Sequence, residues 1–213
     1  MTFALRTLGL DLPTVAGALT RRLHDAGVPV TVDRAWNTIP YYRSTYVFVS
    51  RQDRDLDIAS LEDERLQQLS IGVHLIGDDG ANTPPADALA HRGVTGNIKG
   101  YMIYGDYRQS SPPSRLIEAV ENGEIDIAAA WGPLAGYAAK TSPVSLRITP
   151  IEDDGNFAPL KFRFAIAMGV RHGDHALHQQ LDEAIAHKRN EIRQLLSLYG
   201  VPLVDESKPA AAQ

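Results

Sequence analysis

The stretch VHLIGDDGANTPPADALAHRG, residues 73–93, holds the polar side chains best placed to bind a ligand. An apolar run is followed by a turn with Asp79, Asn82 and Thr83, and then by a helical pattern with two prolines in its first turn. Carboxylate, amide and hydroxyl groups at such a junction can satisfy the free N–H groups of the helix. The same groups can instead face a ligand together with the helix amides. Both interpretations, a capped junction and a binding loop, fit these residues.

Three familiar loop types do not fit this turn. The letters GDDGAN do not match the G-x-G-x-x-G of dinucleotide loops, and no Gly-Lys-Ser/Thr follows as in a P-loop. A calcium loop would also need a glutamate at its twelfth position, and none stands there. The sequence therefore disfavours a dinucleotide, a nucleoside triphosphate or calcium as the ligand of this turn.

Catalytic and metal-binding patterns are weak in the rest of the chain. His172, His175 and His178 are spaced by three residues, and the last two could share a helix face and bind a metal. They flank the apolar stripe of that helix, however, so we expect them to face solvent. The chain has no cysteine, which excludes catalysis by a thiolate, and no G-x-S-x-G pattern, the motif that carries the nucleophilic serine of α/β-hydrolases. We expect no enzyme activity, no bound metal and no cofactor.

Aromatic residues supply a second set of candidate binding residues. Trp131 ends an apolar run and directly precedes Gly132-Pro133. A tryptophan in that place either fills the core or forms the floor of a cleft. Tyr41, Tyr42 and Arg43 come just before a strand pattern, where they either pack against the protein or face a ligand.

The composition is that of a slightly acidic globular protein. The chain has 213 residues, of which 44% are hydrophobic and 22% charged, with a formal net charge of -5. Binding to nucleic-acid phosphates needs clustered Lys and Arg, so we expect no nucleic-acid partner. No apolar run approaches the ~20 residues of a membrane span. Residues 1–27 also lack the basic start and unbroken apolar core of a signal peptide, so neither membrane insertion nor a visible export signal is expected.

Strand and helix patterns alternate along the chain. Strands are predicted near 45–50, 70–75, 98–103, 125–130, 146–151 and 160–166. Helices are predicted at 14–26, 83–93, 112–123, 132–140 and 174–199. Apolar strands in such an alternation indicate a parallel sheet with helices on both faces. A single flavodoxin-like domain, with strands from both ends of the chain in one sheet, is the competing fold.

Several stretches of the chain together carry a family resemblance. They are IPYYRSTYVFVSR, LSIGVHLIGDDGANTPPADALAHRG, GYMIYGDY, RLIEAVENGEIDIAAAWGPLAGY and FRFAIAMGVRHGD. From about Thr38 to Val204, the chain resembles the two-lobed, type II periplasmic solute-binding proteins. More narrowly, it is similar to the MoxJ-like group associated with quinoprotein methanol dehydrogenases, and the combination of IGDDGANTPP with WGPLAGY is specific.

The resemblance implies an α/β fold of the type II periplasmic-binding-protein kind, with one complete lobe built on a parallel-type sheet and a partial second lobe. Lobe two would span 50–159, with crossovers at 45–50 and 160–166. Lobe one would be represented only by 38–49 and 160–204, its first half apparently missing. Residues 1–37 would form an atypical N-terminal segment, and 205–213 a disordered tail.

The resemblance also assigns candidate ligand-binding residues. The turn after the first strand of lobe two faces the cleft between the lobes in this architecture. Asp79, Asn82 and Thr83 then become cleft residues, and Trp131 would face them from the same lobe. On the opposite side of the cleft, the resemblance places Tyr41, Tyr42 and Arg43.

Two functions follow from the resemblance. The first is a non-enzymatic periplasmic binding protein that contacts a quinoprotein (methanol-type) alcohol dehydrogenase and acts in its activation or assembly. The alternative is a solute receptor of an ABC transporter that binds a small polar molecule between the lobes. Amino-acid receptors anchor the α-carboxylate with a cleft arginine. Arg43 is the only clear candidate for that role, which favours the first function.

The helix predicted at 174–199 carries an apolar stripe that an incomplete lobe one would leave partly uncovered. Its members are Leu177, Leu181, Ile185, Ile192, Leu195 and Tyr199. Burying apolar surface stabilises a protein by ~25 cal/mol per Å², so leaving such a stripe exposed to water loses many kcal/mol of folding free energy. The helix around Leu19 and Leu23 could cover the stripe, a second copy could cover it, or the region could stay loose and prone to aggregate. We expect a second copy, because one short helix is a small cover, and this would make the protein a homo-oligomer.

Overall fold

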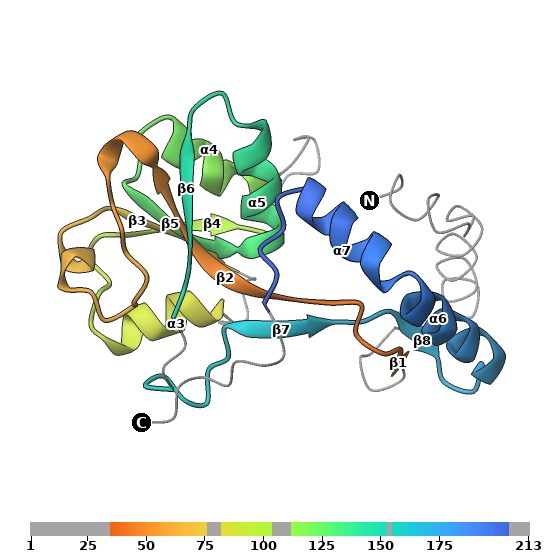
Figure 1. Cartoon of the computed structure of the whole chain (residues 1–213). Helices are drawn as coiled ribbons and strands as arrows, with labels where there is room; N and C mark the ends of the chain where they lie inside the picture. Colours follow the sequence, from red (N-terminus) through yellow and green to blue (C-terminus); the bar gives the residue numbers. More distant parts are fainter. Residues whose placement is uncertain (1–34, 76–81, 104–111, 153–154, 205–213) are drawn as a thin grey trace. The chain divides into compact units, whose positions relative to one another are not determined.

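The computed structural model describes residues 35–75, 82–103, 112–152 and 155–204 (Figure 1). The helix predicted at 14–26 and the tail at 205–213 lie outside these residues. Within the described ranges, no helix is both long enough and sufficiently apolar to cross a membrane.

The described residues divide into two compact units. Unit 1 consists of 35–42 and 165–195, and unit 2 consists of 43–164 and 196–204. The chain passes between them within three elements, β2 (Tyr42–Arg51), β7 (Arg163–Ile166) and α7 (Arg189–Leu198). The lobe boundaries expected from the resemblance stay a prediction.

Unit 2 is built on a mixed sheet. Its strand order is β4 (Ile98–Met102), β3 (Ile71–Leu75), β5 (Ile127–Trp131), β2 and β6 (Leu146–Pro150), and β7 also pairs with β2. The predicted parallel arrangement holds for β3 with both β4 and β5, while β2 runs antiparallel to β5 and β6. No α-helix connects β2 to β3. The connection contains only the short 3-10 turns η2 (Gln52–Arg54) and η3 (Glu64–Gln67), so β3 starts at the end of the sheet where β2 stops.

Two clusters of buried apolar side chains lie on the two faces of this sheet. On one face, α3 (Pro84–His91) packs with Phe48 of β2, and on the other, α4 (Arg115–Glu121) and α5 (Gly132–Thr141) pack with Val47. Alternate residues of a strand point to opposite faces, so β2 contributes to both layers. Residues 127–130 of β5 are at most 1% exposed, which confirms the buried strand predicted near 125–130.

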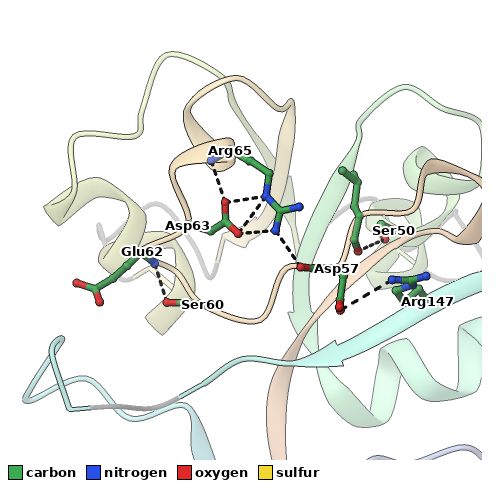
Figure 2. Close-up of polar contacts among 8 residues, drawn as sticks. Ser50, Asp57, Ser60, Glu62, Asp63, Arg65 and Arg147 are labelled. Carbon is green, nitrogen blue, oxygen red and sulfur yellow. Dashed lines mark hydrogen bonds and ion pairs between the residues drawn. The ribbon is translucent and has the colours of Figure 1, made fainter.

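Arginine side chains hold the long connection between β2 and β3. Arg65 donates hydrogen bonds to both carboxylate oxygens of Asp63 and, over 2.9 Å, to the backbone carbonyl of Asp57 (Figure 2). Arg147 of β6 forms ion pairs with Asp55 at 2.8 Å and with Asp57 at 3.8 Å. Exposed ion pairs each contribute little free energy. Their role here is to fix the path of a segment that has few backbone hydrogen bonds of its own.

Unit 1 contains a two-stranded sheet and a pair of helices. β1 (Ala35–Asn37) pairs antiparallel with β8 (Gly169–Arg171), and α6 (His175–His187) and α7 follow. One helix was predicted over 174–199, and this is wrong in one respect, because the helix breaks at Lys188. The backbone of Lys188 has φ -99° and ψ 12°, outside the helical region. Neither glycine nor proline marks the break, so the sequence carried no signal for it.

Half of the apolar stripe predicted on this helix is buried within a single chain, and Leu177, Leu195 and Tyr199 are only partly buried. Leu181, Ile185 and Ile192 are 5%, 4% and 6% exposed. Less apolar surface is therefore left for a second copy than the sequence suggested. Self-association stays a prediction.

Candidate functional site

Trp131 is the last residue of β5 and lies at the edge of the sheet where the parallel strands β3, β4 and β5 end. The apolar run of β5 stops there because Gly132-Pro133 begins α5 at once. Across the antiparallel pair of strands, Trp131 stands opposite Tyr46 of β2. Ligands of open α/β sheets bind beyond the carboxyl ends of the strands, so this edge is the first place to look for a site.

Tyr46, Trp131 and Phe164 form an aromatic cluster at this edge. The ring centroid of Trp131 lies 5.3 Å from that of Tyr46 and 5.8 Å from that of Phe164. The centroids of Tyr46 and Phe164 are 6.2 Å apart, and all three pairs pack edge to face. Rings at these separations touch one another, so they leave no space for a ligand between them. Tyr46 and Trp131 are half-buried, and Phe164 is 37% exposed. The aromatic cluster is therefore partly exposed at the surface of unit 2.

Burial also raises the pKa of the Tyr46 hydroxyl. A tyrosine is neutral near pH 7 even at its ordinary pKa of about 10, so the aromatic cluster carries no charge of its own there. Half-buried, uncharged aromatic groups are enriched among the residues that contribute most to protein–protein binding.

The polar turn after β3 lies only partly within the described residues. Asp79 is outside them, and Asn82 is exposed and forms an isolated bridge with Leu75. Thr83 is 2% exposed, and its hydroxyl donates a 2.9 Å hydrogen bond to the carbonyl of His74. Although Thr83 is the N-cap of α3, its side chain bonds to no helix amide. The hydroxyl thus connects the start of α3 to β3, and a role of Thr83 in ligand binding stays a prediction.

Prolines remove amide donors from the helix starts that follow these strands. Pro84 and Pro85 take the first two positions of α3, and Pro133 lies in the first turn of α5. The 3-10 turn η4 (Pro112–Ser114), which leads into α4, likewise begins with two prolines. Proline has no N–H group, and free amides at a helix start are what usually hold a carboxylate or a phosphate. Among the described residues, the helix starts at this edge therefore offer few backbone amides that could bind an anion.

His74 is a buried residue beneath this edge that the sequence analysis did not single out. It is 3% exposed, and its Nε2 lies 3.0 Å from the carbonyl oxygen of Pro113, so this nitrogen carries a proton. Burial lowers the pKa of His74, and the hydrogen bond to Pro113 offsets part of this effect. Through its ring and its own carbonyl, His74 connects β3 to the start of η4 and to Thr83. The sequence signal that could have identified His74 is a histidine within an otherwise apolar strand pattern.

The two tyrosines and the arginine at the start of β2 divide between the two units. Tyr41 precedes β2, and Tyr42 and Arg43 are its first two residues. Tyr41 and Tyr42 of unit 1 pack edge to face with centroids 5.0 Å apart, and the amide of Tyr41 donates to the carbonyl of Ile166. Burial, together with the neighbouring Tyr41, raises the pKa of Tyr42 to about 12. Arg43 of unit 2 is exposed, and its carbonyl accepts a hydrogen bond from the amide of Val204.

The three histidines near the start of α6 surround Trp36. His178 stacks on its indole at 4.2 Å, and His175 and His172 lie at 4.8 Å and 6.0 Å, centroid to centroid. His175 is exposed, as predicted, and so is His172. His178 was also expected to face solvent, but it is half-buried, with Nε2 3.0 Å from the carbonyl oxygen of Asn37. In the part of the chain that the structure describes, no group of three or more histidine or acidic residues could hold a metal ion.

Comparison with characterised proteins identifies the relatives of this chain. It is 31% identical over 206 residues to Protein MoxJ of Methylorubrum extorquens, an alignment that covers 91% of this chain and 67% of the relative. The chain belongs to the MoxJ family. Protein MoxJ of Paracoccus denitrificans is 28% identical over 200 residues, with 85% of this chain and 67% of the relative covered. No protein-family model matches the sequence.

Solved structures give the fold of the MoxJ family. The periplasmic binding protein XoxJ from Methylobacterium extorquens AM1 matches with a TM-score of 0.67 and 29% identity, over 81% of this chain and 74% of XoxJ. MxaJ from Methlophaga aminisulfidivorans MPT matches with a TM-score of 0.63 and 24% identity, over 81% and 72% of the two chains. An ancestral cationic amino acid solute binding protein shares the fold, with a TM-score of 0.55 and 14% identity over 82% and 67%. The fold is thus that of type II periplasmic binding proteins, as the resemblance implied.

Within the MoxJ family fold, the structure groups the predicted site residues by unit. Trp131 and Asn82 lie on unit 2. Trp131 is the last residue of β5, and Asn82 forms a bridge with Leu75, the last residue of β3. Tyr41 and Tyr42 lie on unit 1. Tyr46 and Phe164, which complete the aromatic cluster with Trp131, were not predicted as site residues. The sequence shows Tyr46 as an aromatic residue within a strand pattern, but its pairing with Trp131 depends on the strand register.

Proposed function

We propose that this member of the MoxJ family is a non-enzymatic periplasmic protein that binds a quinoprotein (methanol-type) alcohol dehydrogenase and acts in its activation or assembly. The contact is made through the aromatic cluster of unit 2. Asn82, Asp79, Arg43 and the Tyr41–Tyr42 pair are proposed as further contacts.

The observation that carries this proposal is the chemistry of the edge where β5 ends. Three mutually packed aromatic rings present an uncharged surface there, while prolines occupy the starts of α3, η4 and α5. A receptor for an amino acid needs donors for the α-carboxylate, and at the helix starts that the structure describes here prolines take the place of several amide donors. A protein surface, in contrast, gains most from rigid aromatic side chains that lose little conformational entropy on binding.

A binding assay with both kinds of ligand tests the proposal. The purified protein is immobilised, and the quinoprotein alcohol dehydrogenase of the same organism is passed over it in biolayer interferometry. In parallel, thermal melts are recorded with each of the common amino acids, acetate and methanol at millimolar concentration. We expect saturable binding of the dehydrogenase and no shift of the melting temperature with any solute.

The two arms separate the proposed function from its alternative. Saturable binding stabilises a protein in proportion to the logarithm of ligand concentration over Kd, so a tight solute would raise the melting temperature by several degrees. Such a shift, with no binding of the dehydrogenase, would establish the solute receptor instead.

A further inference from the structure

The C-terminal segment Leu196–Val204 is a well-defined part of unit 2. α7 ends in a pair of nested hydrogen bonds, from the amide of Gly200 to the carbonyl of Ser197 and from Val201 to Leu196, each 2.9 Å long. Gly200 has φ +72°, a conformation that only glycine adopts readily. This cap turns the chain away from the helix and sends residues 201–204 across unit 2.

The segment first lies against α5. The backbones of Gly136 and Gly200 approach so closely that a Cβ on Gly136 would overlap the carbonyl oxygen of Gly200. On either side of this contact, Tyr137 stacks on Tyr199 with centroids 5.9 Å apart, and the Lys140 ammonium donates to the carbonyl of Leu198. Only a residue without a side chain at position 136 allows this approach.

The segment then reaches the residues next to the aromatic cluster. The side chain of Pro202 lies 3.1 Å from the position of a Cβ on Gly132, and its carbonyl accepts a 2.6 Å hydrogen bond from the Ser44 hydroxyl. The amide of Val204 donates to the carbonyl of Arg43 over 3.2 Å. Gly132 directly follows Trp131, and Ser44 lies two residues before Tyr46. One segment therefore touches the backbone on both sides of the Trp131–Tyr46 pair.

We infer that Leu196–Val204 positions the aromatic cluster by clamping the first turn of α5 to the start of β2. Gly136, Gly200, Pro202 and Ser44 are its positioning residues. Trp131 sits at the junction of β5 and α5, so a displacement of α5 moves its ring relative to Tyr46. This inference rests on the proposed function for its biological meaning, but its structural part can be tested alone.

The test uses Trp131 as its own reporter. The sequence contains two tryptophans, Trp36 and Trp131, so Trp36→Phe leaves Trp131 as the only one. In that background Gly136→Ala introduces the overlap with Gly200, and Gly96→Ala makes the same chemical change where no atom lies within 4 Å. We expect Gly136→Ala to shift the Trp131 emission and alter the near-ultraviolet circular dichroism, and Gly96→Ala to change neither. Affinity for the dehydrogenase should fall about tenfold with Gly136→Ala, a modest loss for an interface residue.

A second variant covers the case in which Gly136→Ala does not fold. Ser44→Ala removes the hydrogen bond to Pro202 and adds no volume, and it should shift the Trp131 emission in the same direction by a smaller amount. Unchanged Trp131 spectra in every folded variant would overturn the inference. If the spectra change while the dehydrogenase binds neither the parent nor the variants, the positioning role stands and the proposed function fails.

Discussion

Trp131 and Tyr46 face each other across the antiparallel strands β5 and β2, with ring centroids 5.3 Å apart. The pair lies where β5 passes into α5, and Phe164 completes the aromatic cluster. None of the three rings is fully buried, so each contributes both to the core and to the surface. A change at any of them should consequently affect stability and binding together, and the two effects must be measured separately.

Thr83→Val should destabilise unit 2 without affecting binding of the dehydrogenase. Valine has nearly the same shape, but it leaves the buried carbonyl of His74 without its donor. Leaving such a group unsatisfied costs about 1–3 kcal/mol in the free energy of unfolding. Urea unfolding measures this loss, and Thr95→Val, at an exposed position, is the control. An unfolding free energy equal to that of the wild type would show that the Thr83 hydroxyl contributes nothing.

His74 should make the protein less stable in acid. Burial holds the pKa of His74 in the folded protein below its ordinary value of about 6.5 in the unfolded chain. Below that pH the unfolded chain binds a proton that the folded protein takes up less readily. The stabilisation is therefore fully present above about pH 6.5 and is lost as the pH falls further.

His74→Gln should flatten this pH dependence, because the glutamine amide can still donate to Pro113 but does not titrate. Urea unfolding at pH 7.5 and pH 5.0 gives the difference for the wild type, for His74→Gln and for His91→Gln, whose residue is exposed. Parallel losses in the wild type and His74→Gln would contradict the assignment.

Asp182→Ala should loosen the chain between β1 and Tyr41. The Asp182 carboxylate accepts the amide of Ile39 at 2.8 Å and lies 3.4 Å from Nδ1 of His178. Its removal should cost about 1 kcal/mol of unfolding free energy. Hydrogen exchange of the Ile39 amide should accelerate. The neighbouring variant Glu183→Ala removes an exposed carboxylate and should leave this amide unchanged, and equal exchange rates in the two variants would argue against the assigned role of Asp182.

The elements of unit 2 could be predicted from the sequence because its strands and helices have clear periods and clear ends. The run of β5, with small and branched apolar residues stopped by Gly132-Pro133, is an example, and so is α3 with its two leading prolines. The antiparallel direction of β2 was not predicted. The direction of β2 relative to its neighbours depends on whether residues 52–70 form a crossover helix. Arginine side chains hold this connection, and its sequence shows no helical period that would have indicated its path.

The candidate site was foreseen in part. Trp131 stood out because a large aromatic residue ended a buried strand, but its partners Tyr46 and Phe164 come from β2 and β7, distant in sequence. Thr83 was expected to cap the helix or to line a cleft. Its hydroxyl donates to the carbonyl of His74 and makes no cap bond, while its place in a cleft stays a prediction. Side-chain contacts between distant strands depend on register, which local patterns do not encode.

The affinity of Trp131→Ala for the quinoprotein alcohol dehydrogenase tests the central claim most directly. Biolayer interferometry compares the wild type, Trp131→Ala and the control Trp36→Ala, each checked for a cooperative thermal melt. The account predicts at least a roughly tenfold weaker Kd for Trp131→Ala, as for the loss of an aromatic hot-spot residue, and little change for Trp36→Ala. An affinity of folded Trp131→Ala equal to that of the wild type would contradict it.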